Sequence, residues 1–583
     1  MTDMIPADPA SPAGGALAED AGVAAERERL ARQLRETRMQ LAMTETRLAA
    51  LEQSSTMKFG RTIANAAKKP WPRGALLPRD LFRLWKDRAA PKSGAKNAAT
   101  ALAAAQLADL SGTGGRFLSS LTAPGVLALA DPALTLAGGL SAGSVGTGAG
   151  LVITGAISAL GCATLAPDAV VHPLLPHDAD VLLEGTGADL VLIEAAALLP
   201  GAPWAYATDP AAADRGRRLA RLIVLARSLG KPVVLIRNVP QSLMPGIGWL
   251  AASCDAVIEA GLGVQLARFN PIGITVARAT TPVYAGARDP REAPAVRALL
   301  DALTEGPNPA VQLAGDAARS WRSLPALYRD HAVFVTASAD QAREQAASGA
   351  RVIGPLGSGT DAGTVRGQLE AVRGGRPAGI TDVRSWLREI FVNHATPARL
   401  ADIVRAAELP ADLVRGRQIA ILARVADADA AGRLASALLD QRLRPTEVIA
   451  AVPSGSASAV AVAVREALGK LTDHDIRVVV TPEAPHVGEA ALDWARPLAR
   501  LADAPWLTPW SAEDATRPST YLLDLACARE CAQADAVGFG SGEYEFTHWL
   551  ERPALIKSAL LAPGGPAAAD WGSHGLRLFT IIA

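Results

Sequence analysis

From about residue 120 onward, short apolar runs alternate with longer segments whose apolar residues recur at helical spacing. The apolar runs are continuous and rich in β-branched residues, which is typical of parallel strands covered on both faces. The predicted strands of this region are 150–160, 188–196, 231–239, 254–261, 281–287, 331–337 and 350–355. With helices predicted at 212–229 and 398–409, the alternation indicates an α/β fold with room for two doubly wound domains.

A third α/β unit begins near residue 417. Its predicted strands are 417–425, 446–452 and 475–483, and its predicted helices are 430–441 and 521–534. The pattern before residue 120 is different and predicts no sheet.

The N-terminal part is predicted to hold a disordered leader at 1–24, followed by a heptad repeat within 25–56. Apolar and threonine residues recur there in alternating steps of four and three, at Leu30, Leu34, Thr37, Leu41, Thr44, Leu48 and Leu51. This pattern predicts a coiled coil that makes the chain a homodimer. The alternative is a lone amphipathic helix packed on the rest of the protein.

The segment 57–114 is a basic amphipathic stretch that leads into a linker. Its lysines and arginines are interleaved with the aromatic residues Phe59, Trp71, Phe82 and Trp85. Such a segment can lie on an anionic membrane surface. The alternative is a connector whose aromatic side chains dock on the protein.

Composition limits the classes of function and the compartment. The 583 residues carry 58 basic and 58 acidic side chains, and this balance argues against nucleic acid as the main partner. Four cysteines in so long a chain suit a reducing compartment. The acidic, proline-rich start lacks the pattern of a secretory signal. The uncharged stretch 132–167 is rich in glycine, which favours a loop and a buried strand over a membrane helix. We therefore expect a cytoplasmic protein, with peripheral contact at the inner face of the cell membrane as a further hypothesis.

The sequence contains no GxGxxG fingerprint, no P-loop and no HExxH metal motif. Ligands of open α/β sheets bind beyond the carboxyl ends of strands, so polar residues at those ends are the candidates. Gly286 and Arg288 lie in the turn at the end of a predicted strand, where a glycine permits close approach of a phosphate and an arginine can bind it. The ordinary interpretation of Arg288 is that of a loop residue.

Two further places carry candidate chemistry. Glu344 lies in a predicted helix, where its carboxylate could accept hydrogen bonds from sugar hydroxyls. Glu513 and Asp514 follow an apolar segment, and adjacent carboxylates there could hold Mg²⁺ or Mn²⁺ bridging a diphosphate. The ordinary interpretations are a surface glutamate and an acid pair at a helix N-terminus.

The region 150–412 resembles the bacterial spore-maturation-protein-like glycosyltransferases. The resemblance runs in order through ADLVLIEAAALLPGAPWAYA, GKPVVLIRNVPQ, CDAVIEAG, VYAGARD, LPALYRDHAVFVTASADQAREQAASGARVIGP and IFVNHATPARLADIVRAAEL. It implies a GT-B fold, in which 115–275 forms the N-terminal Rossmann-like domain and 276–412 forms the domain that binds the sugar-nucleotide donor.

Matched residue by residue, this resemblance implies a donor site and an acceptor-side cleft. The donor residues are Gly286, Arg288, Arg343, Glu344 and Gly349, and the acceptor-side residues are Glu194 and Asn238. The sequence departs from the pattern where Thr336 stands in place of a second glutamate of related enzymes. It also lacks the acids that normally follow the asparagine in the stretch IRNVPQ.

The tail, 413–583, is similar to the family-2 glycosyltransferases of GT-A fold. The similarity rests on RQIAILARVADADAAGRLASALLDQRLRPTEVIAAV and on ADAPWLTPWSAEDATRPSTYLLDLACARECAQADAVGFGSGEYEF. The D-x-D metal motif of that family would fall on Ser511 and Glu513, with Asp514 retained. We interpret the tail as a degenerate GT-A-like module.

These patterns support two hypotheses of different classes. The first is a glycosyltransferase that moves a sugar from a nucleotide sugar to a cell-envelope polysaccharide or related glycan. The second is a non-catalytic scaffold or glycan-binding protein that is built from glycosyltransferase folds and dimerises through its coiled coil.

Overall fold

The structure is a computed structural model that describes residues 150–582 with short gaps. The gaps are 240–243, 245, 275–277, 287–293, 306–308, 315–320, 322, 357–359, 375–377, 455–457, 484–491, 512–516, 541–543 and 563–564. The predicted leader, coiled coil and basic segment within 1–114 lie outside the described residues. The described residues fall into two compact units. The segment His177–Gly187, which carries α8 (Ala179–Gly185), belongs to one unit, and all other described residues belong to the other.

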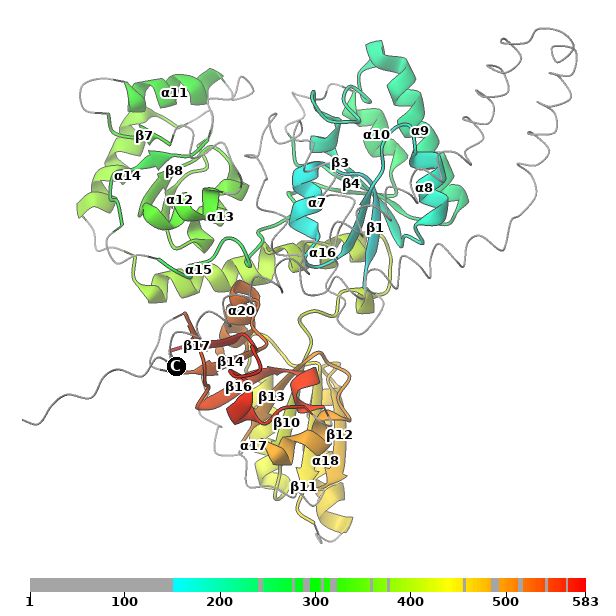
Figure 1. Cartoon of the computed structure of the whole chain (residues 1–583), viewed down its shortest axis with the longest axis vertical. Helices are drawn as coiled ribbons and strands as arrows, with labels where there is room; N and C mark the ends of the chain where they lie inside the picture. The colour runs from blue at the N-terminus through cyan, green and yellow to red at the C-terminus, as the bar shows by residue number, and fades with distance from the viewer. Residues whose placement is uncertain are drawn as a thin grey trace, which may run out of the picture. The chain divides into compact units, whose positions relative to one another are not determined.

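The first domain of the larger unit is built on an all-parallel sheet (Figure 1). In spatial order its strands are β2 (Val170–Pro173), β1 (Val152–Ala156), β3 (Leu190–Glu194), β4 (Val233–Ile236) and β5 (Ala256–Ile258). Its helices are α7 (Ala159–Leu165), α9 (Ala213–Ser228) and α10 (Ile247–Ser253). The strands predicted in this region are confirmed, and β2, which has no long apolar run, was not predicted.

The strand order places β1 beside β3, so the winding of the first sheet reverses between them. Loops that leave the carboxyl ends of such a strand pair diverge and open a crevice. Residues at the ends of β1, β3 and β4 therefore share one edge of the sheet.

The second domain contains a smaller parallel sheet. Its strands in spatial order are β7 (Gln312–Leu313), β6 (Val283–Tyr284), β8 (Val333–Val335) and β9 (Arg351–Ile353). The helices of this part of the chain are α11 (Pro294–Thr304), α12 (Leu324–Asp330), α13 (Ala339–Ala347), α14 (Ala362–Gly374), α15 (Ile380–Asn393) and α16 (Thr396–Ala406). The parallel α/β architecture that the apolar runs predict is thus present in both domains.

The C-terminal module has a mixed sheet of eight strands in the described residues. In spatial order they are β12 (Arg477–Pro482), β11 (Glu447–Val452), β10 (Ile419–Arg424), β13 (Trp506–Trp510), β16 (Arg552–Lys557), β14 (Ala536–Phe539), β17 (Leu578–Ile581) and β15 (Glu545–Thr547). Its helices are α17 (Ala428–Leu439), α18 (Ser458–Thr472), α19 (Arg496–Ala499) and α20 (Tyr521–Ala532). Strands β12 to β13 are parallel, whereas β16 runs antiparallel to both β13 and β14.

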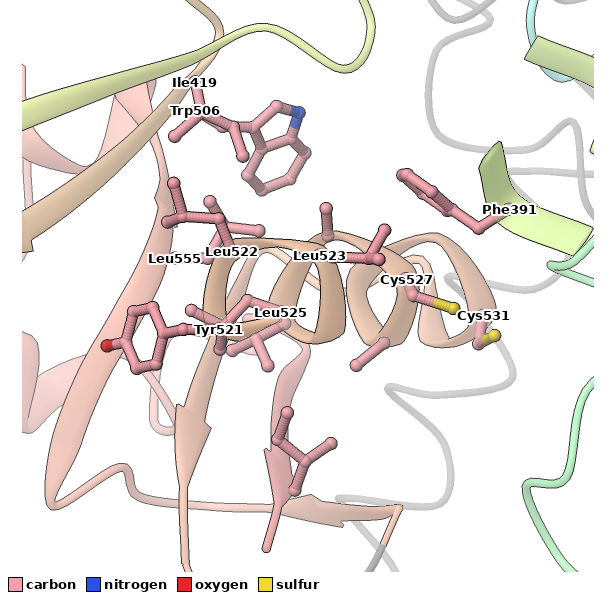
Figure 2. Packing of buried hydrophobic residues seen from close by; sticks show 14 of the residues in the cluster. Phe391, Ile419, Trp506, Tyr521, Leu522, Leu523, Leu525, Cys527, Cys531 and Leu555 are labelled. Atoms are coloured by element: carbon pink, nitrogen blue, oxygen red, sulfur yellow. The ribbon is translucent and has the colours of Figure 1, made fainter. Parts of the chain in front are cut away.

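Helix α20 is buried on nearly all sides. Ten of its 12 residues are buried, and Figure 2 shows apolar side chains around it, among them Phe391, Trp506 and Leu555. Phe391 belongs to α15, whereas Trp506 and Leu555 belong to strands of the module. The helix therefore joins the core of its own sheet to a helix that precedes the module.

No helix among the described residues is long and apolar enough to cross a membrane.

Truncation of a side chain in the α20 core should destabilise the protein strongly. Leu522 is fully buried, so Leu522→Ala is expected to lower the free energy of unfolding by roughly 2–5 kcal/mol. Leu501→Ala removes a leucine that is 39% exposed in the same module and should change it by about 0.5 kcal/mol or less. Urea unfolding of both variants measures the difference, and equal effects would contradict the packing described for α20.

Candidate functional site

Glu194 ends β3 at the edge where the first sheet reverses its winding. It is 2% exposed, and its two carboxylate oxygens have different partners. Oε2 accepts a hydrogen bond from the Ser158 backbone N–H at 2.7 Å, and Oε1 accepts one from Asn238 Nδ2 at 2.8 Å. The two residues implied for the acceptor-side cleft therefore touch each other.

Asn238 and Ser158 tie Glu194 to neighbouring turns. Asn238 Oδ1 accepts a hydrogen bond from the Ala196 N–H at 3.1 Å, and the Ser158 hydroxyl caps α7 by accepting from the Gly161 N–H at 2.9 Å. A Cβ at Gly161 would lie 2.3 Å from Glu194 Oε2, so only glycine leaves room for the carboxylate. The turns after β1, β3 and β4 are thus fixed around one buried acid.

Burial raises the pKa of Glu194 above its ordinary value, while the hydrogen bonds from Ser158 and Asn238 act in the opposite direction. Burial, and secondarily the charge of Glu194, also raises the pKa of the neighbouring Cys162 thiol. A thiol with a raised pKa is a poor nucleophile, so Cys162 is a core residue at this edge.

Glu344 lies in the middle of α13 in the second domain. Its side chain is partly buried, and its buried Oε2 atom has no hydrogen-bond partner among the described residues. Burial, and then the charge of Asp340, raises the pKa of Glu344 to about 8, although the Arg268 guanidinium acts to lower it. At neutral pH this carboxyl group is mostly protonated and can both donate and accept a hydrogen bond.

Gly286 and Thr336 share the carboxyl edge of the second sheet. Strands β6 and β8 are neighbours, and Tyr284 is in register with Val335, so the residues that follow them lie at the same edge. Thr336, where the resemblance implies a second acid, accepts a hydrogen bond from the Ser338 N–H at 3.2 Å and lies 3.1 Å from Gln341 Oε1. Its hydroxyl therefore shapes the turn that begins α13.

Arg343 and Gly349 have local partners. Arg343 forms an ion pair with Asp340 one helical turn earlier, with Nη1 and Oδ1 2.8 Å apart. Gly349 has a φ of +81° just after the end of α13, and its carbonyl accepts a hydrogen bond from Arg278 Nη1 at 2.6 Å. Because Gly349 precedes β9 while Gly286 follows β6, these two glycines lie at opposite edges of the parallel sheet.

Three predicted site residues, Arg288, Glu513 and Asp514, lie outside the described residues. Within the described part of the chain, no group of three or more His, Cys, Asp or Glu side chains could hold a metal ion. A role for Glu513 and Asp514 in metal binding stays a prediction.

Two residues that surround the site, Ser158 and Arg268, were not predicted from the sequence. Ser158 could have been found, because a serine directly after a strand and before a helix is a common N-cap. Arg268 carries no such signal, since it lies far from Glu344 in the sequence. It is anchored by its stacking over the Trp321 ring at 4.1 Å.

Removal of the Asn238 amide should destabilise the first domain. Asn238→Ala leaves one buried oxygen of Glu194 and the Ala196 N–H without their partner, which costs roughly 1–3 kcal/mol of unfolding free energy. Asn393→Ala, which removes an exposed amide bonded only to Glu389, should have little effect. Chemical denaturation compares the two variants. Equal losses of unfolding free energy would contradict a stabilising role of the contacts that Asn238 makes with Glu194 and Ala196.

The pKa of Glu344 predicts a specific pH dependence of stability. Between about pH 4.5 and pH 8 the folded protein keeps a proton on Glu344 that the unfolded chain has lost, so the free energy of unfolding falls as pH rises through this window. The fall should be smaller in Glu344→Gln, which carries no titrating group.

The pKa of Asp168 is also raised, to about 7, and its contribution is the same in both proteins. Urea titrations at intervals across the window give the two slopes. Parallel curves for wild type and variant would contradict the raised pKa of Glu344.

No known protein-family model and no curated protein matches the sequence. Among solved structures, a nucleotidyl transferase from Methanothermobacter thermautotroptrophicus shares 16% identity, with 29% of this chain and 88% of that chain aligned and a TM-score of 0.21. The mannosyltransferase PcManGT from Pyrobaculum calidifontis, solved with GDP-Man and Mn²⁺, shares 18% identity over 28% of this chain and 55% of its own, with a TM-score of 0.23. S. aureus TarS shares 10% identity over 28% of this chain and 58% of its own, with a TM-score of 0.21. The chain thus spans little more than half of the last two structures, and at such TM-scores none of these likenesses carries an argument about this protein.

Proposed function

We propose that this protein is a glycosyltransferase that moves a sugar from a nucleotide-sugar donor to a cell-envelope polysaccharide or related glycan. In this proposal the second domain holds the donor, and the acceptor approaches from the first domain. The two domains would form a GT-B pair. The C-terminal module would be a GT-A-like unit.

The observation that carries the proposal is the state of Glu344. A carboxyl group with a pKa of about 8 is neutral at pH 7, and its Oε2 has no hydrogen-bond partner among the described residues. Leaving a buried polar atom unsatisfied costs free energy, so such an atom needs a specific reason to persist. Sugar hydroxyls both donate and accept hydrogen bonds, which makes them suitable partners for a neutral acid.

The carboxyl edge of the second sheet supports the phosphate part of the proposal. Gly286 has no side chain of its own to block an approach to the backbone, and α13 begins at the same edge after Ser338. The N-terminus of a helix favours negative charge. A donor diphosphate at this edge would receive Arg288 as its counter-charge, in the role that the family resemblance assigns to this residue.

The acceptor side favours a mechanism without a protein base. Both oxygens of Glu194 already accept hydrogen bonds, and the residue is almost fully buried. In the proposed reaction the acceptor oxygen forms a bond to the anomeric carbon, the bond from that carbon to the diphosphate breaks, and the leaving diphosphate takes the acceptor's proton.

The same observation on Glu194 favours one alternative, a non-catalytic scaffold or glycan-binding protein. An acid that is used to fix three turns contributes to the fold rather than to turnover. Homodimerisation through 25–56 and membrane contact through 57–114 fit either function and stay proposals.

Ligand binding tests the proposal directly. Thermal unfolding is followed with a panel of nucleotide sugars and nucleoside diphosphates, with and without Mg²⁺ or Mn²⁺. A ligand at 100 times its Kd should add about 2.7 kcal/mol to stability. Glu344→Ala should weaken binding of the matching nucleotide sugar about tenfold or more, because each lost hydrogen bond costs roughly 1–3 kcal/mol.

Glu370→Ala is the matched control, since Glu370 is exposed on α14 of the same domain. It should leave the Kd unchanged. Stabilisation that requires metal and disappears in Glu513→Ala would move the donor site to the C-terminal module. A protein that binds none of these ligands would support the scaffold.

A further inference from the structure

The chain passes twice between the first and second domains. One passage is the segment 261–270, which we call the first crossing, and the other is 391–396, the second crossing. Segment 391–396 is a crossing because α16, which follows it, returns to the first domain. There Leu400, Ile403 and Val404 pack into the core of the first sheet. Motion between the two domains must bend both segments.

The two crossings are bonded to each other through their backbones. The Val264 N–H donates to the His394 carbonyl at 2.8 Å, and the Thr396 N–H donates to the Val264 carbonyl at 3.1 Å. Gly263 has a φ of +88°, and a Cβ there would lie within 2.9 Å of the second crossing. The two crossings are therefore joined to each other, and we call the bonded pair the hinge.

The C-terminal module reaches the second crossing through Arg417. The Arg417 guanidinium stacks on the Phe391 ring at 3.7 Å, and its Nη1 donates to the Phe391 carbonyl at 2.6 Å. Its Nε and Nη2 both donate to the Glu530 carboxylate of α20, each at 2.9 Å. Glu530 is 4% exposed, so this bidentate pair is screened from water.

The module also reaches the first crossing. Asn270 Nδ2 donates to the carbonyl of Cys531, the residue after Glu530, at 3.2 Å. The Asn270 carbonyl accepts from Arg329 Nε at 3.0 Å, which ties the same residue to α12 of the second domain. The last turn of α20 thus contacts the first crossing directly and reaches the second crossing through Arg417.

We propose that the C-terminal module is a clamp on this hinge. The last turn of α20 holds both crossings through Glu530, Arg417 and the Cys531 carbonyl, and thereby limits the range of motion between the first and second domains. A change that loosens this turn, such as occupation of the module by a ligand, would widen that range. The clamp does not depend on the proposed glycosyltransferase activity, because it concerns the hinge and not the donor.

Distances between two spin labels, measured by pulsed electron paramagnetic resonance, test the clamp in the full-length chain. Spin labels are placed at Arg221→Cys on α9 and Gln368→Cys on α14, both exposed positions, in a Cys254→Ser background and diluted with unlabelled protein. Glu530→Gln weakens the pair with Arg417, and Phe391→Leu removes the ring on which Arg417 stacks while keeping an apolar side chain. Each variant should at least double the width of the distance distribution.

Arg477→Met is the matched control, since Arg477 pairs with the buried Glu447 inside the module, on the edge strand β12. It should leave the width unchanged. Hydrogen exchange of the Val264 and Thr396 amides gives a second readout, and both should lose protection in the hinge variants only.

Distance distributions of wild-type width in both hinge variants would overturn the proposal. If Glu530→Gln unfolds the module, a wild-type width in Phe391→Leu alone overturns it. Equal broadening in the Arg477→Met control would overturn it as well, because the effect would then follow from the general stability of the module.

Discussion

A helix that is buried on nearly all sides cannot be stable on the surface of a single sheet, and α20 imposes this constraint on the structure. Its own strands cover one side, and α15 covers another, so the core of the module continues into the second domain. Two bidentate ion pairs fix its orientation, Arg388 with Asp524 near one end and Arg417 with Glu530 near the other. Since desolvation offsets much of the attraction in such pairs, we interpret them as specifying how the helix docks rather than as its main source of stability.

The two glutamates of the candidate site show how the same chemical group can have different roles. Burial raises the pKa of both Glu194 and Glu344. The carboxylate of Glu194 is saturated by a backbone N–H and an amide, and three turns depend on it. Glu344 keeps one oxygen without a partner among the described residues, which is why the proposed donor site and not the proposed acceptor cleft carries the functional proposal.

Part of the regular structure could be predicted from the sequence, because continuous β-branched runs and helical periodicity are local signals. The helix predicted at 212–229 is α9, and the strand predicted at 188–196 contains β3. Some unpredicted strands, such as β14 and β17, are largely buried apolar runs that were not recognised, whereas others lack such a run. Strand β2 is short and only partly buried, and β15 is an exposed edge strand whose pairing with β17 depends on distant residues.

The sequence by itself determined the α/β class, the order of the main strands, the presence of Glu194, Asn238 and Gly286 at or near the ends of strands, and the place of Glu344 in a helix. Only the tertiary structure decided that Asn238 bonds Glu194, that Gly349 lies at the opposite sheet edge from Gly286, and that Arg417 joins Glu530 to Phe391. The physical reason is that burial, partner and pKa depend on groups brought together from far along the chain, and periodicity carries no information about them.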